Sequence, residues 1–255
     1  MQSKLHQRAA AALTLALLAA LPAMAQTAPD VQALLKAADK YRMSADNLQV
    51  ETQVLVLNAD GSTDKERRYT VFAQADRQSL VLMRSPAETG QKVLMLGDDY
   101  WLLMPGSQRA LRITPMQKLL GDASTGDIAT LRWADDYSGT VAAEEPCGEP
   151  AQPCLHLSLT ASRKGVSYQR IELWLGKAHH EPVKADLYVL SDKLAKRARF
   201  VLDPASPVPQ VAEMHLQDEL SSRKLTRVRY LSRKPHTVPP AWLNPMFLAR
   251  NPQLE

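Results

Sequence analysis

The sequence has few residues of the kinds that build covalent or metal-based scaffolds. Its 255 residues include only two cysteines, ten glycines and three phenylalanines. It contains no Gly-x-Ser-x-Gly elbow, no His-Glu-x-x-His pair and no glycine-rich phosphate loop, which argues against the enzyme classes built on those motifs. A Ser-His-Asp triad needs no fixed spacing, so that alternative stays open. We predict a protein that is not an enzyme and needs no cofactor.

Side chains that bind metal ions are present, but they do not have ligand spacing. His179 and His180 are adjacent at an expected turn, where neighbouring side chains diverge. Four aspartates between residues 122 and 136 lack the spacing of a calcium-binding loop. Helix caps and turns explain them, so we predict no metal site.

The charges of the chain are nearly balanced. With 31 basic and 27 acidic side chains the net charge is +4. It falls to +2 (29 minus 27) without Lys4 and Arg8, which belong to the N-terminal segment described next. This charge is too small to indicate a nucleic-acid partner. Basic residues do gather between Lys193 and Lys234, which fits either a solvated strand face or an attraction to anionic headgroups or an acidic partner.

The N-terminus has the pattern of an export signal. The two basic residues precede an apolar run from Ala9 to Leu21, and Ala23-Met24-Ala25 supplies the small residues that signal peptidase requires. The run has about 13 residues, whereas roughly 20 are needed to span a bilayer. A cleaved signal peptide over residues 1–25 is therefore favoured over a retained membrane anchor.

The predicted cleavage, between Ala25 and Gln26, defines the mature protein. Residues 26–255 are enough for one domain, which we place in a bacterial periplasm. No cysteine follows the apolar run to carry a lipid. Cys147 and Cys154 enclose six residues, and in an oxidising compartment such a pair most often forms a disulfide. We predict a structural disulfide rather than a redox or metal site.

Hydrophobic periodicity predicts one amphipathic helix followed by many short strands. Asp30 can cap a helix whose apolar stripe contains Leu34, Leu35 and Ala38, with Arg42 near its C-terminus, where cations are favoured. From residue 48 the period changes to two, and turn residues separate the strands. Strands are expected at 48–58, 66–75, 78–84, 91–96, 100–104, 109–113, 137–143, 155–160, 168–175, 182–190, 195–202, 211–216 and 225–231.

Two short helical pieces interrupt the predicted strands. One is expected at Met116–Leu120, and another is expected to begin at a cap formed by Asp127. About a dozen strands with few helices indicate a mainly β fold of the α+β type, in which one curved antiparallel sheet carries helices on its concave face.

Three neighbouring strands are apolar on both faces. Residues 79–83, 93–96 and 101–104 barely alternate, although a sheet with one solvated face should alternate clearly. The second face must therefore meet helices or a ligand, and the methionines there either fill core gaps or adapt to varied apolar partners. Alternation selects six cavity-lining candidates: Leu80, Leu82, Val93, Met95, Leu102 and Met104. The helix residues Leu34, Leu35 and Ala38 are the expected lid contacts.

The order of motifs in the middle of the chain resembles a known family. Ser85-Pro86-Ala87-Glu88-Thr89-Gly90 precedes an apolar strand, which is followed by Asp98-Asp99-Tyr100-Trp101-Leu102-Leu103-Met104-Pro105-Gly106 and a strand with two arginines. Gly121-Asp122-Ala123-Ser124 and Gly126-Asp127 come next. This order is similar to that of the outer-membrane lipoprotein-sorting proteins, relatives of the periplasmic carrier LolA. Met104 stands where an aromatic residue is common, and no residue matches the carrier's lid-gating arginine.

The resemblance implies a half-open antiparallel β-barrel of about 11–12 strands with a helical lid. It implies a monomeric periplasmic carrier that shelters lipid or lipoprotein acyl chains, between an inner-membrane exporter and an outer-membrane acceptor. Burial of apolar chains needs no covalent step. A periplasmic sensor with a regulatory role, an enzyme on the same scaffold and a structural envelope protein without a cavity remain the alternatives.

Overall fold

The computed structural model describes residues 30–130, 132–220 and 225–254. The predicted signal peptide and the cleavage pair Ala25 and Gln26 lie outside this range. The helices are α1 (Val31–Asp39), η1 (Pro86–Glu88), α2 (Thr125–Ala129), η2 (Pro240–Leu243) and α3 (Pro245–Leu248). None of the described helices is long and apolar enough to cross a membrane.

Most of the chain forms strands. They are β1 (Leu48–Leu57), β2 (Thr63–Gln74), β3 (Gln78–Met83), β4 (Lys92–Leu96), β5 (Asp99–Leu103), β6 (Ala110–Ile113), β7 (Lys118–Leu120), β8 (Ala123–Ser124), β9 (Tyr137–Cys147), β10 (Gln152–Ala161), β11 (Arg170–Gly176), β12 (Pro182–Tyr188), β13 (Leu194–Leu202), β14 (Val211–Asp218) and β15 (Leu225–Pro235).

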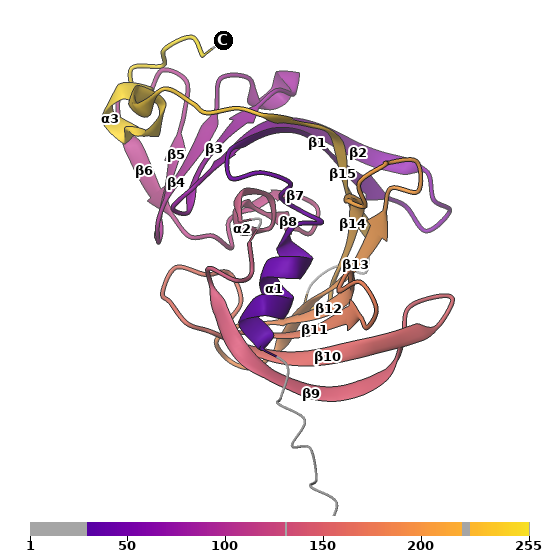
Figure 1. Cartoon of the computed structure of the whole chain (residues 1–255). Coiled ribbons are helices and arrows are strands. Elements are labelled where there is room, and N and C mark those ends of the chain that lie inside the picture. Colours follow the sequence, from indigo (N-terminus) through magenta and orange to yellow (C-terminus); the bar gives the residue numbers. More distant parts are fainter. Residues whose placement is uncertain (1–29, 131, 221–224, 255) are drawn as a thin grey trace, which may run out of the picture.

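Thirteen of these strands form one antiparallel sheet. Its order is β6-β5-β4-β3-β2-β1-β15-β14-β13-β12-β11-β10-β9, so β15, the last strand in the chain, pairs with β1, the first. The ends of the sheet, β6 and β9, do not pair with each other, and the sheet curves into an open barrel (Figure 1). The predicted fold class, a half-open antiparallel barrel with helical elements, is confirmed.

The concave side of the sheet holds α1, α2 and the small β7–β8 hairpin (Figure 1). Two predictions in this region are wrong. Residues expected to be helical at Met116–Leu120 include the strand β7, because five residues carry too little pattern to separate one helical turn from a short strand. The cap of α2 is Ser124, whereas Asp127 lies within the first turn.

The apolar side chains divide into two clusters on opposite faces of the sheet. The inner cluster fills the concave side and includes Leu35 of α1 and Ile128 of α2. The outer cluster combines convex-face residues of β2–β5 with the C-terminal segment, residues 236–254. Its buried members are Phe72, Leu80, Leu82, Leu94, Leu103, Val238, Leu248 and Ala249.

Candidate functional site

Helix α1 lies inside the curve of the sheet and covers its concave face (Figure 1). Asp30 caps the helix by accepting a hydrogen bond from the Gln32 backbone N–H at 2.9 Å. The predicted lid residues Leu34, Leu35 and Ala38 are all buried in the inner cluster. The helix therefore has an apolar face against the sheet, as its periodicity predicts, and it occupies the space that a ligand of the concave face would need.

The six cavity-lining candidates do not lie on one face of the sheet. Leu80 and Leu82 belong to the outer cluster, together with residues of the C-terminal segment. The other candidates that lie in strands belong to the inner cluster: Val93, Met95 and Leu102. The strand pairing joins Leu80 to Leu94 and Val81 to Val93, so the β3 residues that face the concave side are Val81 and Met83. A run that is apolar at every position contains no alternation from which to choose the face.

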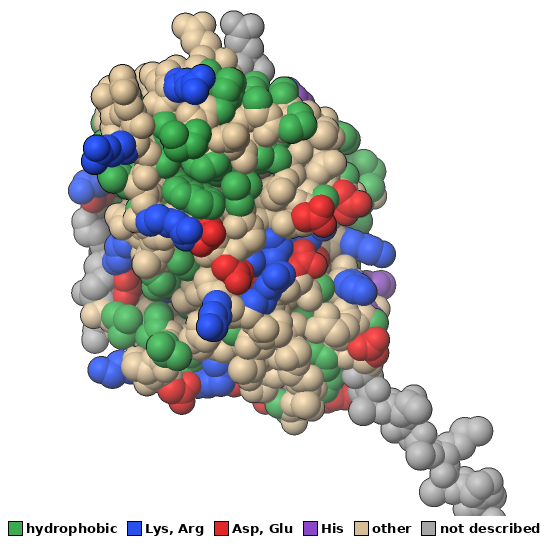
Figure 2. Space-filling model, turned by 90° about the vertical axis from the view of Figure 1, so that its left-hand side faces the viewer, with side chains coloured by type: hydrophobic (Ala, Val, Ile, Leu, Met, Phe, Trp, Pro, Cys, Tyr) green, Lys and Arg blue, Asp and Glu red, His purple; other side chains and the backbone are tan. Residues whose placement is uncertain are grey.

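The concave face is only partly covered near the sheet edge at β6. Leu102 is half-buried and packs against the inner cluster. Leu111 of β6 lies opposite it and is 50% exposed, and Ile113 and Met116 are half-buried. Met104, which follows β5, is 36% exposed. Figure 2 shows the side of the molecule that carries β6 and α3 in Figure 1, and hydrophobic side chains gather in its upper part.

A buried polar network holds α2 against the sheet. Asp127 accepts hydrogen bonds from the Ser124 backbone N–H at 2.8 Å and from the Tyr168 hydroxyl at 2.7 Å. The Lys196 ammonium of β13 lies 2.6 Å from the same carboxylate, and both side chains are buried. Burial alone would raise the pKa of Asp127, but Lys196 and Ser124 outweigh it and hold the pKa below its usual range. Asp127 is therefore a structural anchor with a complete set of partners.

A second buried ion pair ties the loop before β9 to the β2–β3 turn. The Arg77 guanidinium lies 2.6 Å from Asp136 and 2.5 Å from Asp98. Arg77 has a φ of +54°, which is unusual for a residue other than glycine. Burial raises the pKa of Asp136, and Arg77 opposes the shift. Among the described residues, no group of three His, Cys, Asp or Glu side chains is arranged to hold a metal ion.

The end of α1 is attached to the segment that follows α2. The Asp39 carboxylate accepts hydrogen bonds from the backbone N–H groups of Trp133 at 2.8 Å and Ala134 at 2.9 Å. Burial raises the pKa of Asp39 to about 6. Arg42 donates to the Thr130 carbonyl at 3.2 Å and lies 4.2 Å above the Trp133 ring. Sequence reasoning placed Arg42 only as a helix-terminal cation and missed these contacts, which join residues far apart in the chain.

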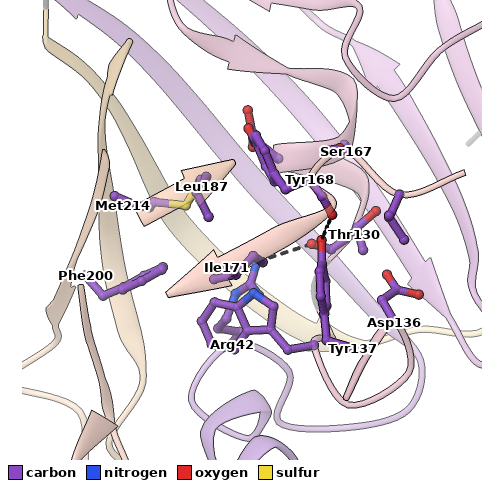
Figure 3. Close-up of a pocket in the computed structure, with 15 residues that line it drawn as sticks. Arg42, Thr130, Asp136, Tyr137, Ser167, Tyr168, Ile171, Leu187, Phe200 and Met214 are labelled. Carbon is purple, nitrogen blue, oxygen red and sulfur yellow. Dashed lines mark hydrogen bonds between the residues drawn. The ribbon is translucent and has the colours of Figure 1, made fainter. Parts of the chain in front are cut away.

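A small, partly open cavity remains between these elements (Figure 3). Its volume is about 50 Å³, enough for a few water molecules and too small for an acyl chain. Phe200 and Met214 lie toward one end and Asp136 and Ser167 toward the other (Figure 3). A long apolar ligand that bound at this cavity would therefore have to displace α1, or Thr130 and Trp133, from the concave face.

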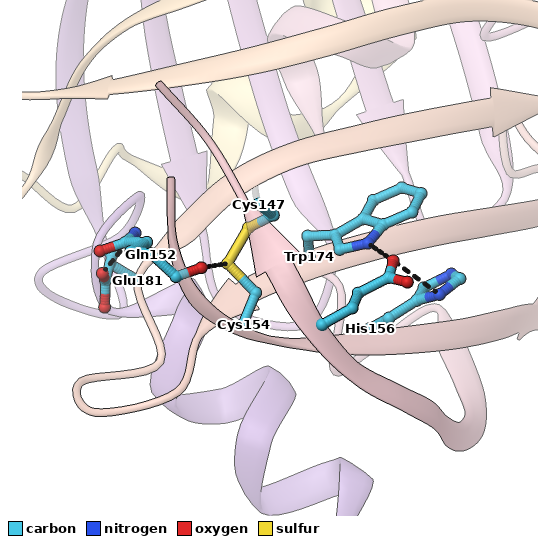
Figure 4. The surroundings of a disulfide bond; sticks show 7 residues. Cys147, Gln152, Cys154, His156, Trp174 and Glu181 are labelled. Carbon is cyan, nitrogen blue, oxygen red and sulfur yellow. Dashed lines mark hydrogen bonds and ion pairs between the residues drawn. A yellow bond between two sulfur atoms is a disulfide. The ribbon is translucent and has the colours of Figure 1, made fainter. Parts of the chain in front are cut away.

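The predicted disulfide between Cys147 and Cys154 is confirmed (Figure 4). It links β9 to β10 on the convex face and packs beside Trp174. The His156 ring stacks on Trp174 at a centroid distance of 4.2 Å. The bond fixes the hairpin at the β9 edge of the sheet, away from the concave cluster, so its role is structural.

Comparisons with known proteins agree with this architecture. A model of a family described as an uncharacterized protein matches residues 75–250, and the chain belongs to that family. A LolA superfamily protein from Nitrosomonas europaea has a TM-score of 0.77 and 27% sequence identity, covering 85% of this chain and 98% of that one. A search of curated proteins finds no match.

Two further structures share the fold at lower identity. A domain from Vibrio parahaemolyticus, named for outer membrane lipoprotein sorting, has a TM-score of 0.65 and 19% identity, and covers 85% of this chain and 98% of its own. A DUF1329 family protein from Desulfovibrio piger has a TM-score of 0.67 and 20% identity over the same shares. The predicted resemblance to the LolA-like proteins is thus confirmed.

Proposed function

We propose that the protein is a periplasmic carrier that shelters lipid or lipoprotein acyl chains on the concave face of its sheet. The mature chain, residues 26–255, acts as one untethered domain between an inner-membrane exporter and an outer-membrane acceptor. The likeness to a LolA superfamily protein and to a domain named for lipoprotein sorting supports this role. No catalytic step is required.

The incompletely covered concave face carries the proposal. The inner cluster continues into the strip formed by Leu102, Leu111, Ile113 and Met116, which α1 and α2 leave partly exposed. An acyl chain can begin its contact there. Each methylene group that it buries contributes about 0.8 kcal/mol, so about ten methylenes supply roughly 8 kcal/mol toward displacing the helix and ordering the chain.

The cover over this face is suited to displacement. Helix α1 is short, and few polar contacts join it and the residues just after it to the rest of the molecule. Gln32 donates to the Tyr137 carbonyl at 2.7 Å, and the Tyr41 hydroxyl donates to the His179 carbonyl at 2.9 Å. Asp39 and Arg42 provide the contacts to the segment after α2. A net hydrogen bond contributes about 1 kcal/mol, so an incoming chain can offset the loss of these contacts.

Native mass spectrometry of protein purified from the periplasm, combined with lipid extraction, tests the proposal. We expect co-purifying lipid or acylated protein, and we expect the purified protein to bind a fluorescent fatty acid. Protein that carries no lipid and fails to bind the fatty acid would contradict the proposed function.

A matched pair of substitutions locates the entry of the chain. We expect Leu111→Asp to weaken binding of the fluorescent fatty acid about tenfold, because an ionised carboxylate in the strip disfavours apolar contact. Leu231→Asp, on β15, is the control because Leu231 is 49% exposed and Leu111 is 50% exposed. Equal affinities for the two variants would show that the β6 edge is not the entry.

A further inference from the structure

Two arginines on the concave side form no ion pair with any carboxylate of the described residues. Arg42 is only 7% exposed, and its Nε is buried without a hydrogen-bond partner. The Nε of Arg233, at the end of β15, is also buried and without a partner. In the part of the chain that the structure describes, neither guanidinium forms an ion pair. By contrast, Lys196 and Arg77 each form an ion pair with a buried aspartate.

The two guanidinium groups lie in one region. The Val211 backbone N–H donates to the Tyr41 carbonyl at 2.8 Å, and the Val211 carbonyl accepts from Arg233 at 2.5 Å. Arg233 is therefore held beside the backbone of the residue that precedes Arg42. Its guanidinium also lies 4.6 Å above the Tyr230 ring, which packs against the inner cluster.

The nearby acids attract the two arginines only at longer range, without forming an ion pair within the described residues. Asp39 accepts one hydrogen bond on each oxygen from the backbone N–H groups of Trp133 and Ala134, and Asp203 accepts from the Ala205 backbone N–H at 2.9 Å. Burial, with repulsion from Arg42, outweighs the nearby anions and lowers the pKa of Arg233. Two like charges held together in a partly dehydrated site are unfavourable unless an anion is shared between them.

The chemistry of this pair defines the ligand that would fit. A guanidinium presents several donors in a planar fork that matches the oxygens of a carboxylate or a phosphate. Arg42 also lines the cavity beside Phe200 and Met214 (Figure 3). If an anionic group bound at the two arginines, an apolar chain attached to it would therefore lie next to the apolar side chains of this cavity.

We infer that Arg42 and Arg233 bind the headgroup of the cargo, which is an amphiphile with an oxyanion, a carboxylate or a phosphate, at one end of its apolar chain. This inference rests on the proposed carrier function and names the class of cargo. The headgroup lies between the two guanidinium groups, and its chain extends along the inner cluster toward β6.

Three ligands with the same chain test the inference. Decanoate, decyl phosphate and decanol are compared by their displacement of a neutral naphthylamine probe from the full mature protein, with inorganic phosphate as the headgroup alone. We expect one or both anions to bind about tenfold more tightly than decanol. The tighter of the two distinguishes a fatty-acid carboxylate from a phospholipid-type phosphate, and tight binding of inorganic phosphate without a chain would overturn the inference.

Variants assign the preference to the two arginines. In Arg42→Gln/Arg233→Gln the preference for anions is expected to disappear while decanol binding is retained, which also shows that the variant is folded. Arg199→Gln is the control, because Arg199 is exposed on β13 and pairs with Glu149. Equal binding of all three ligands by the unsubstituted protein would overturn the inference and leave the carrier function standing. If neither the probe nor any chain binds, both fail.

Discussion

The two faces of strands β3–β5 are both apolar, but they are covered in different ways. The convex face is covered by the C-terminal segment, which follows the last strand and places Leu248 in the same buried cluster as Leu80 and Leu82. The concave face is covered by α2 and the residues just after it, and α1, which precedes the first strand, completes this cover over β9 (Figure 1). Apolar residues on both faces of a strand therefore require no ligand. The concave cover leaves Leu111 half-exposed and Leu102, Ile113 and Met116 partly exposed on β5, β6 and the turn that follows, so this is the face that we propose for binding.

The largest expected loss of stability comes from a substitution in the outer cover, which is the C-terminal segment on the convex face. We expect Leu248→Ala to lower the free energy of unfolding by about 3 kcal/mol, because the side chain is 1% exposed and leaves a cavity. Met246→Ala in the same helix is expected to cost less than about 0.5 kcal/mol, since Met246 is 67% exposed. Urea unfolding of both variants measures the difference. Similar losses would mean that the segment is not firmly docked.

The stability of the inner cover, which is the set of helices on the concave face, is expected to depend on pH. The pKa of Asp39 is raised from 3.8 to about 6 by burial, so the folded protein binds this proton more tightly than the unfolded chain does. Stability from this group is greatest below about pH 4 and is lost as the pH rises through about 6. The loss is about 2–3 kcal/mol, since one pKa unit corresponds to 1.36 kcal/mol.

Asp39→Asn isolates this effect. The variant cannot ionise, so its stability should not show this loss between pH 4 and 7, although its amide oxygen can serve only one of the two N–H groups and the variant is therefore less stable by a constant amount at every pH. We therefore expect the variant to gain about 2–3 kcal/mol relative to the unsubstituted protein over that range. Chemical denaturation at several pH values measures the gain. Two parallel pH curves would contradict the raised pKa of Asp39.

Much of the fold follows from the sequence because turn chemistry marks the strand ends. The α1 cap, its buried stripe and the strands of the large sheet lie close to their predicted positions. The sequence could not show which side chains of β3 lie on the concave face, since residues 79–83 barely alternate between apolar and polar. The outer cover was expected only as an apolar tail that docks on the body, because no local pattern shows which surface it contacts.

The polar contacts of the concave side were harder to predict. Lys196 pairs with Asp127, and Arg42 with Thr130, across large separations in the chain. One signal was available for Lys196. It falls in the same alternation phase of β13 as Ala198, which is buried in the inner cluster. A basic residue at such a position indicates a buried partner. Arg42 offered no comparable signal, because cations are common at helix ends.

Removal of the two helix caps is expected to change stability only modestly, but it separates the two covers in function. Asp30 caps α1, and Asn244 caps α3 by accepting hydrogen bonds from Met246 and Phe247. Replacement of either by alanine should cost about 1 kcal/mol. If α1 is the element that moves, Asp30→Ala favours its displacement and accelerates association of a fatty acid about fivefold. Asn244→Ala should leave the rate unchanged at a similar loss of stability.

Stopped-flow measurement of the association rate decides between the covers. Because the two caps are removed by the same kind of change, a general loosening of the protein would accelerate both variants equally. Faster association in Asn244→Ala alone would instead identify the C-terminal segment as the movable cover, and the ligand site would then lie on the convex face with Leu80 and Leu82. Only acceleration by Asp30→Ala alone agrees with a carrier that opens by displacing α1 from its concave face.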